Sequence, residues 1–371
     1  MAIFRKITMR VTEREIIQYL QRAGNQYAPL TIKGFEEQVL LPQGYQADAI
    51  IEFSIQDGPC FEAFVEIVLV PTPKNILEKS RALFDYISKT NKPNIIPLII
   101  APYIGKRQAK MLADKGISWI DISGNMSVRV SNQIYIERTG QRNRFPDTAP
   151  IKKIFQGTSS LVSRALLLKP ESFSSLYEVV DFINERNANI TLSTVSKVLK
   201  SLEEELLINK SKSLISVTNR ERLLEKLTEG YTNSTERKSR ETYRFATEST
   251  KKLFFDFYQK QLVYVACGFY AAQIKGLAVT DQITIFVKDI EQVRMAAKQK
   301  WIRITPDAEF GNVSITEVKD PGVWFNVPLP MYNRDAVVDD IELYLEMIAD
   351  TPRGPKIAEQ LKKCILKSDY G

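Results

Sequence analysis

An apolar run of strand length, Ile95–Ala101 (IIPLIIA), limits the fold more than any other part of the sequence. Such a run is typical of a central strand that is covered on both faces. After it, Arg107–Lys115 has the spacing of a helix ended by Gly116, and the segment ISWIDIS is predicted to be another strand. This order of strand, helix and strand indicates a mixed α/β domain.

The same alternation extends over the first 140 residues or so. Ala47–Phe53 and Phe61–Val70 are predicted strands joined by the turn QDGP, and Lys74–Ser88 is a predicted helix. An earlier helix is predicted over Thr12–Ala23, and the alternating segment Met126–Arg138 predicts a hairpin. All of these elements are consistent with one sheet flanked by helices.

Two polar, basic stretches, Glu137–Lys153 and Thr232–Arg244, are predicted to be linkers or exposed connectors. The chain has 371 residues, enough for two or three domains. We therefore predict an α/β multidomain protein with domains over residues 1–140, 151–231 and 244–371. The middle domain is mostly helical with a late hairpin, and the last is again α/β.

The absence of histidine excludes several kinds of chemistry. Serine or cysteine catalysis with a histidine base and histidine metal sites are ruled out, so any catalysis uses carboxylates, lysines, tyrosines or a carboxylate-bound metal. The net charge of +7 gives a mild preference for polyanions. The three cysteines, Cys60, Cys267 and Cys364, lie too far apart for a zinc pattern and fit a reducing cytoplasm.

Glu66 lies in the middle of an otherwise mostly apolar strand, FEAFVEIVLV. A carboxylate there costs free energy unless a metal ion or a basic partner needs it. Asp48 lies at the head of the preceding strand. Two further acids, Glu36 and Glu37, lie in KGFEEQVLL, which is predicted to be helical.

Asp48 and Glu66 resemble the acids of the PD-(D/E)XK restriction-endonuclease-like fold, which hold a divalent metal while a lysine orients the attacking water. The resemblance implies that both are catalytic and bind Mg²⁺, an ion that prefers hard oxygen ligands. It departs at Val68, which stands in the place of the lysine, and Lys74 and Lys79 in the following helix are the candidates to replace it. Alternatively, Asp48 caps a strand, Glu66 pairs with a basic residue, and there is no cofactor.

The stretch PLIIAPYIGKRQAKMLADKGISWIDISGNMSVRV resembles bacterial proteins in which this nuclease-like domain is fused to a winged helix. The shared pattern is an apolar strand ending in Ala-Pro, a helix, Gly-Ile, an aromatic residue, Asp and Gly-Asn. Its members in this sequence are Ala101-Pro102, Gly116-Ile117, Trp119, Asp121 and Gly124-Asn125. For Asp121 and Asn125, turn chemistry around Gly124 is the preferred interpretation.

The middle segment resembles a winged helix-turn-helix in LYEVVDFINERNANITLSTVSKVLKSLEEELLI. Thr191 or Ser193 can cap the second helix of the motif. The resemblance implies that this helix enters the DNA major groove and that KSKS forms the wing tip on the backbone. The implied DNA-binding residues are Ser193, Thr194, Ser196, Lys197, Lys200, Lys210 and Lys212. A winged helix can also dock a protein, and this segment is only weakly basic.

The last segment resembles the C-terminal part of abortive-infection type IV antitoxins, the AbiEi-like group, which resembles a nucleotidyltransferase fold. It has the strand, glycine and helix pattern at Gly268, and DTPRGPKIAEQL resembles the closing helix of that group. A working nucleotidyltransferase needs two acids one residue apart to hold metal ions. Asp281 is followed by Gln282 and Ile283, so a role as scaffold or protein contact is expected.

Three functions follow from these patterns as alternatives. The first is an antitoxin-like, DNA-binding transcriptional regulator with a degenerate nuclease core, whose partners are double-stranded DNA and a toxin or a second copy. The second is an active Mg²⁺-dependent DNA endonuclease targeted by its winged helix, and the third is a protein-interaction adaptor. A cytoplasmic protein without a membrane partner is expected, because the chain lacks both an apolar run of about 18 residues and a signal-peptide core.

Overall fold

The structure is a computed structural model that describes residues 11–40, 46–55, 60–88, 95–130, 134–145, 153–307, 309–327, 336–350 and 352–367. The predicted turn QDGP and residues 146–152 of the first predicted connector lie outside the described residues. The chain divides into two compact units. One comprises Met1–Ile151 with Glu204–Leu206, and the other comprises Lys152–Glu203 with Leu207–Gly371.

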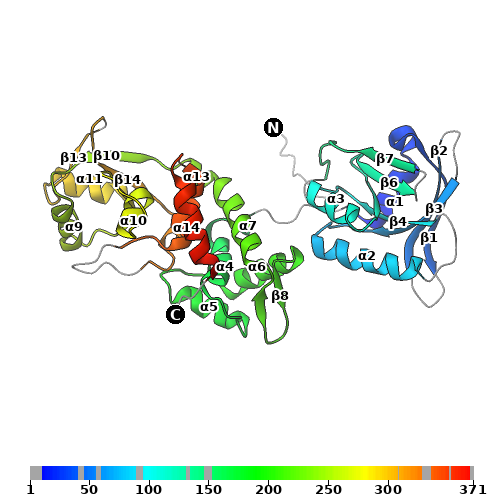
Figure 1. Cartoon of the computed structure of the whole chain (residues 1–371), viewed down its shortest axis with the longest axis horizontal. Coiled ribbons are helices and arrows are strands. Elements are labelled where there is room, and N and C mark those ends of the chain that lie inside the picture. The colour runs from blue at the N-terminus through cyan, green and yellow to red at the C-terminus, as the bar shows by residue number, and fades with distance from the viewer. Residues whose placement is uncertain are drawn as a thin grey trace, which may run out of the picture. The chain divides into compact units, whose positions relative to one another are not determined.

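A seven-stranded mixed sheet forms the first unit, and its strands lie side by side in the order in which they occur along the chain (Figure 1). Strands β3, β4 and β5 run parallel, whereas the remaining neighbours are antiparallel. The strands are β1 (Leu30–Leu40), β2 (Gln46–Ile55), β3 (Cys60–Ile67), β4 (Ile95–Ala101), β5 (Ser118–Asp121), β6 (Met126–Val130) and β7 (Ile134–Arg138). The predicted central strand is confirmed as β4.

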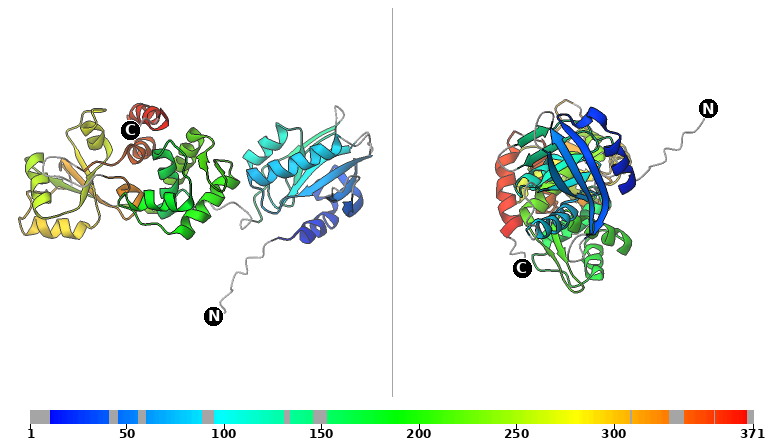
Figure 2. Two further views of the ribbon diagram at one scale, coloured as in Figure 1. Left: turned by 90° about the horizontal axis from the view of Figure 1, so that it is seen from below. Right: turned by 90° about the vertical axis from the view of Figure 1, so that its right-hand side faces the viewer.

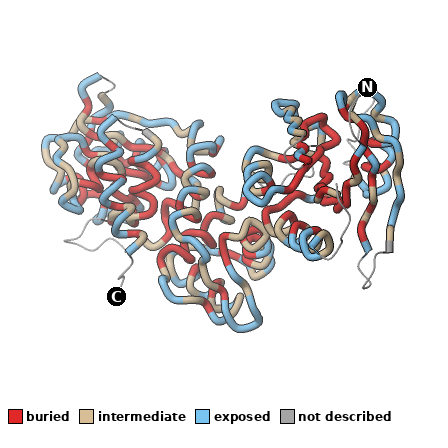
Figure 3. The backbone as a smooth tube through the Cα atoms, turned by 45° about the vertical axis from the view of Figure 1, so that its right-hand side comes forward, coloured by how far each residue is buried: buried red, intermediate tan, exposed pale blue. Residues whose placement is uncertain are grey.

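Helices cover both faces of this sheet (Figure 2). On one face lies α1 (Glu13–Gln21), and on the other lie α2 (Pro73–Ile87) and α3 (Lys106–Ala113). Side chains alternate between the faces of a strand, so Glu66 lies on the same face as Phe64 and Val68, beneath α2. Buried residues follow the strands of the sheet (Figure 3), as two covered faces require.

The helix predicted around Glu36 and Glu37 is wrong. Both residues are exposed on β1, opposite Ile50 and Ala49 of β2. Glutamate and leucine favour helices, but pairing with β2 supplies partners for the backbone groups of this segment, and tertiary context overrides propensity.

Three helices and a short hairpin begin the second unit. They are α4 (Gly157–Leu168), α5 (Leu176–Asn184), α6 (Leu192–Glu204), β8 (Ile208–Lys210) and β9 (Ile215–Val217). The predicted order of elements is found here. Thr191 caps α6 by accepting a hydrogen bond from the backbone nitrogen of Thr194 at 3.3 Å. The apolar face of α6 is buried, and its residues are Val195, Val198, Leu199 and Leu202.

A five-stranded sheet with the order β11-β12-β14-β10-β13 completes this unit together with further helices. The strands are β10 (Thr242–Ala246), β11 (Tyr264–Ala266), β12 (Ile283–Val287), β13 (Thr305–Pro306) and β14 (Val313–Glu317). The helices are α7 (Arg220–Thr232), α8 (Thr235–Lys238), α9 (Thr250–Gln259), α10 (Gly268–Ile274), α11 (Ile290–Lys298), α12 (Pro321–Trp324), α13 (Asp340–Asp350) and α14 (Gly354–Lys367). Within the described residues, every helix is too short or too polar to cross a bilayer.

The second predicted connector, Thr232–Arg244, is not a linker. It contains α8 and begins β10, which pairs with both β13 and β14. Arg240 is an example of a charged residue of this segment that is packed into the fold. Its side chain is 8% exposed and donates a hydrogen bond to Glu236 at 3.0 Å. The polar composition of Thr232–Arg244 therefore gave no sign of β10, a strand of the second sheet.

A buried ion pair joins distant segments of the second unit. Arg164 of α4 donates to Glu342 of α13 at 2.5 Å, and both side chains are at most 2% exposed. Asp339 lies beside the pair and caps α13 by accepting from the backbone nitrogen of Glu342 at 2.7 Å. Burial raises the pKa of Asp339 to about 6. One apolar core runs from α4 to α14 around these charges, so the middle and last segments of the chain pack as one body.

Candidate active site

Two carboxylates and one ammonium group meet where β2 and β3 lie beneath α2. Ala49 of β2 pairs with Val65 of β3, and continuing this register by one residue brings Asp48 opposite Glu66. The amine of Lys79 donates to Oε2 of Glu66 and lies 3.3 Å from Oδ2 of Asp48. The same Asp48 oxygen accepts from the backbone nitrogen of Ile67 at 2.7 Å, which orients the carboxylate. The structure thus brings together three of the four residues predicted for catalysis.

Lys79 is protonated at neutral pH in this setting. Burial by itself lowers the pKa of Lys79, but the hydrogen bond and charge of Glu66, together with Asp48, outweigh burial and leave the pKa raised. Glu66 is 2% exposed at its side chain, whereas the Lys79 side chain is 40% exposed. The ammonium therefore neutralises a buried carboxylate while remaining open to solvent. It can donate hydrogen bonds and cannot act as a general base.

The residue two positions after Glu66 is Val68 and not a lysine, so the cation beside Glu66 comes from another element, the helix α2. The Val68 side chain is buried in the apolar core between the sheet and the helices α2 and α3. Lys79 follows Ile76 by three residues and precedes Leu83 by four, so it shares their face of α2, which packs on the sheet. That spacing is the signal in the sequence that favours Lys79. Lys74, in the first turn of α2, stays a candidate.

The metal ligands predicted from the sequence are two carboxylates, Asp48 and Glu66. Within the described residues there is no group of three acidic, cysteine or histidine side chains that could hold a metal ion. Mg²⁺ commonly uses one or two protein carboxylates and takes its other ligands from water and substrate phosphate. The hard oxygens of Asp48 and Glu66 fit this chemistry. The Asp48 side chain is 22% exposed, so water can reach it.

Asp121 and Asn125 form a closed turn. The Asp121 carboxylate accepts hydrogen bonds from the backbone nitrogens of Ile104 at 3.0 Å and Asn125 at 2.8 Å. Gly124, which lies between Asp121 and Asn125 in the chain, has a φ of 105°. The Asn125 amide also donates to Asp121 at 2.9 Å. These bonds agree with turn chemistry, the interpretation preferred from the sequence.

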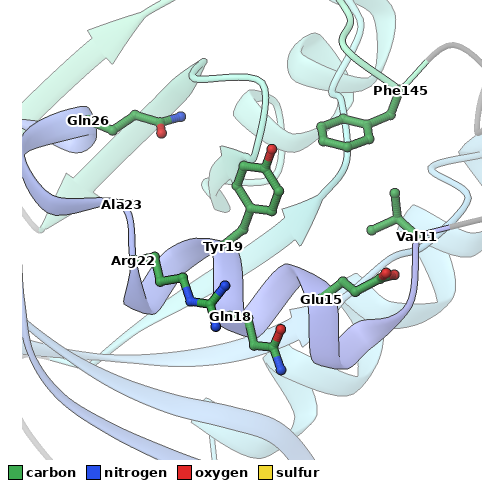
Figure 4. Close-up of a pocket in the computed structure, with 8 residues that line it drawn as sticks. All are labelled: Val11, Glu15, Gln18, Tyr19, Arg22, Ala23, Gln26 and Phe145. Carbon is green, nitrogen blue, oxygen red and sulfur yellow. The ribbon is translucent and has the colours of Figure 1, made fainter.

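A separate cavity of about 510 Å³ lies beside α1 (Figure 4). Tyr19 and Phe145 face each other across it at 6.0 Å between ring centroids, edge to face. Its carboxylate, Glu15, is engaged in the capping box of α1 with Thr12. Because α1 covers the face of the sheet opposite to α2, this cavity is not part of the Asp48 and Glu66 site.

The residues predicted to contact DNA lie on α6 and the β8–β9 hairpin. Those on α6 are Ser193, Thr194, Ser196, Lys197 and Lys200, and those on the hairpin and its tip are Lys210 and Lys212. Lys197, Lys200 and Lys212 are exposed. Lys197 and Lys200 are therefore open to solvent on the side of α6 away from its apolar core, and Lys212 is exposed between β8 and β9.

The backbone N–H of Gly268 already has a hydrogen-bond partner within the protein. The Gly268 nitrogen donates to Oε2 of Glu346 at 2.6 Å, so a carboxylate occupies the donor that a nucleotide phosphate would need. Asp281 is exposed. We expect no magnesium-dependent ATP binding at this place, to be measured by isothermal titration calorimetry with the full chain. Tight binding that requires Mg²⁺ and is lost in Gly268→Val would contradict this expectation.

No family model and no curated protein matches the chain. Two solved structures resemble part of it at low similarity. The crystal structure of a repair endonuclease from Pyrococcus abyssi is 13% identical with a TM-score of 0.23, and the structure of EndoMS in apo form is 8% identical with a TM-score of 0.21. Each match covers 30% of this chain and 47% of the other, so the chain spans about half the length of those proteins.

Proposed function

We propose that the first unit is a Mg²⁺-dependent endonuclease that hydrolyses the phosphodiester backbone of DNA. The observation that carries this proposal is the position of the Lys79 amine, which contacts Glu66 and lies 3.3 Å from Asp48. Lys79 of α2 supplies the positive charge that the nuclease motif has at the position of Val68. Two acids and a lysine are the groups that the nuclease motif requires.

Each of these groups has a role that follows from its surroundings. Bound Mg²⁺ would polarise the phosphate and lower the pKa of a water molecule. Asp48 and Glu66 would hold the ion, and the bond from Ile67 keeps the Asp48 carboxylate in place. Lys79, held as an ammonium by its raised pKa, would donate hydrogen bonds to the attacking water or to a phosphate oxygen. Its charge also offsets the charge that develops on the phosphate.

A cleavage assay with the full chain tests this proposal. Supercoiled plasmid and linear duplex are incubated with Mg²⁺ or Mn²⁺, and with EDTA as the control. Nicking or linearisation that requires the metal is expected. Intact DNA under all of these conditions, from protein that binds the same duplex, would contradict it.

A DNA-binding regulator with an inactive core is the second candidate. One observation favours it: the Lys79 ammonium contacts both carboxylates and offsets one of their two negative charges. In such a protein the three charges would be a structural ion-pair group. Duplex binding without cleavage, unaffected by Mg²⁺, is the result that this candidate requires.

In either case, we propose that α4 to β9 form a winged helix that binds duplex DNA, with α6 in the major groove. The exposed lysines of α6 support this assignment. The double variant Lys197→Ala/Lys200→Ala should weaken duplex binding for all sequences, because lysine contacts to phosphate carry no base information. It should also flatten the slope of log affinity against log salt by about one unit per lost contact. Fluorescence anisotropy at several salt concentrations measures both effects.

Lys356→Ala/Lys363→Ala, which removes two exposed lysines of α14, is the matched control. It removes the same charge from the chain and should leave the slope nearly unchanged. A salt slope in Lys197→Ala/Lys200→Ala equal to that of the unmodified chain would remove α6 from the DNA interface.

A further inference from the structure

A groove of about 960 Å³ in the second unit has no role in the function proposed above. It lies between the N-terminal part of α9, the C-terminal part of α11 and the edge formed by β10 and β13. Five cationic residues line it: Lys252, Arg294, Lys298, Lys300 and Arg303. Among the described lining residues, Glu248 is the one carboxylate, so the lining carries a net charge of +4.

The groove combines an apolar floor with a cationic rim. The accessible apolar lining consists of the half-buried Ala246 and Ala297 and the exposed Pro306, together with the buried Phe245, Ile302 and Ile304. All five cations are exposed. An apolar surface bordered by several cations suits a ligand that carries both flat rings and negative charges.

Three of the cations are available for a ligand. Among the described residues, no acidic side chain forms an ion pair with Lys252, Lys298 or Lys300. Arg303 lies 3.2 Å from Asp256, and Arg294 donates to Glu291 at 2.7 Å and lies over the ring of Tyr243. These two arginines are held in place by their partners, and the three lysines add charge that the protein does not neutralise.

A purely structural role accounts for only part of this charge. Lys298 lies in the last turn of α11, where a cation stabilises the helix dipole. Lys252 lies in the first turn of α9, where a cation is unfavourable for the same reason.

We propose that this groove binds a single strand of nucleic acid, with phosphates on the cationic rim and bases on the apolar floor. The proposal does not depend on cleavage by the first unit. The unpaired bases of a single strand can contact the apolar floor of a concave groove. The bases of a duplex are stacked and paired, so they cannot make this contact. A flat membrane surface would leave the floor unused, and a single nucleotide would engage only some of the cations.

The test measures binding of labelled single-stranded DNA to the full chain in EDTA, where no metal-dependent cleavage occurs. The double variant Lys252→Ala/Lys298→Ala should lower the affinity by roughly tenfold and flatten the salt slope by about 1.4, since each single-strand phosphate contact contributes about 0.7. Lys252→Arg/Lys298→Arg should retain both. Thermal melting of each variant separates loss of binding from loss of stability.

Lys251→Ala/Lys356→Ala is the matched control, because both lysines are exposed on helices and neither lines the groove. An equal loss in the control, or an unchanged affinity and slope in Lys252→Ala/Lys298→Ala, would overturn the proposal. So would competition by ATP as strong as by an oligonucleotide, or tighter binding to anionic phosphatidylserine vesicles than to the strand. Lys79→Met, which should lose cleavage, should bind the strand normally, so failure of the nuclease proposal is distinguishable from failure of this one.

Discussion

Replacing Lys79 with methionine should lower Mg²⁺-dependent DNA cleavage by roughly 100-fold or more, the usual effect of losing a donor that stabilises developing charge. Methionine keeps the length and apolar stem of the side chain but removes the ammonium that contacts Glu66 and lies near Asp48. Duplex affinity should change little, because this one charge is not needed for docking by α6. Single-turnover cleavage of a labelled duplex, measured well below the melting temperature, gives the rate.

Arg81→Met is the matched control, since Arg81 is an exposed cation on the same helix. It should cleave at the rate of the unmodified chain. Asp48→Ala and Glu66→Ala should lose cleavage as Lys79→Met does, and Lys79→Arg should keep part of it. Full activity in Lys79→Met together with loss in Lys74→Met would transfer the role to Lys74.

Arg164→Met should destabilise the second unit by about 3–5 kcal/mol, the range found when one partner of a buried ion pair is removed. The substitution leaves Glu342 buried without its cation and removes the positive charge that lowers the pKa of Asp339. Denaturant unfolding, followed by tryptophan fluorescence with Trp301 and Trp324 as reporters in this unit, measures the change.

The double variant Arg164→Met/Glu342→Gln should recover most of that loss, because it removes the uncompensated charge as well. Arg186→Met is the matched control, as Arg186 lies near the surface and contacts the exposed Glu185 at 3.8 Å. Surface ion pairs contribute about 0–1 kcal/mol, so its effect should be small. A loss below about 1 kcal/mol for Arg164→Met would show that the buried pair does not hold α4 to α13.

Much of the first unit could be predicted from local patterns. The apolar run of β4, the helix α2 and the strands of Asp48 and Glu66 all follow from periodicity, because each of these elements buries a regular set of side chains. The segment around Glu36 and Glu37 could not be predicted in this way. Its residues favour a helix locally, and only the neighbouring β2 makes it a strand.

The candidate site was predictable in its residue types and less so in its geometry. The sequence offered both Lys74 and Lys79, and the choice depends on which face of α2 packs on the sheet. The cationic groove was not predictable at all. Lys252 lies more than 40 residues before Lys298 and Arg303 in the sequence, and the pairing of β10 with β13 helps to bring these two parts of the chain to one groove.

The strand order of the first sheet has a consequence for how the protein is made. Every strand from β2 to β7 pairs with the strand synthesised just before it, so each can join the sheet as it leaves the ribosome. The second unit lacks this property. There β10 pairs with β14, which follows about 70 residues later in the chain. Arg164 forms its ion pair with Glu342, which is 178 residues away in the sequence. We therefore expect the first unit to assemble during translation, whereas the first helices of the second unit complete their packing only after nearly all of the remaining chain has been made.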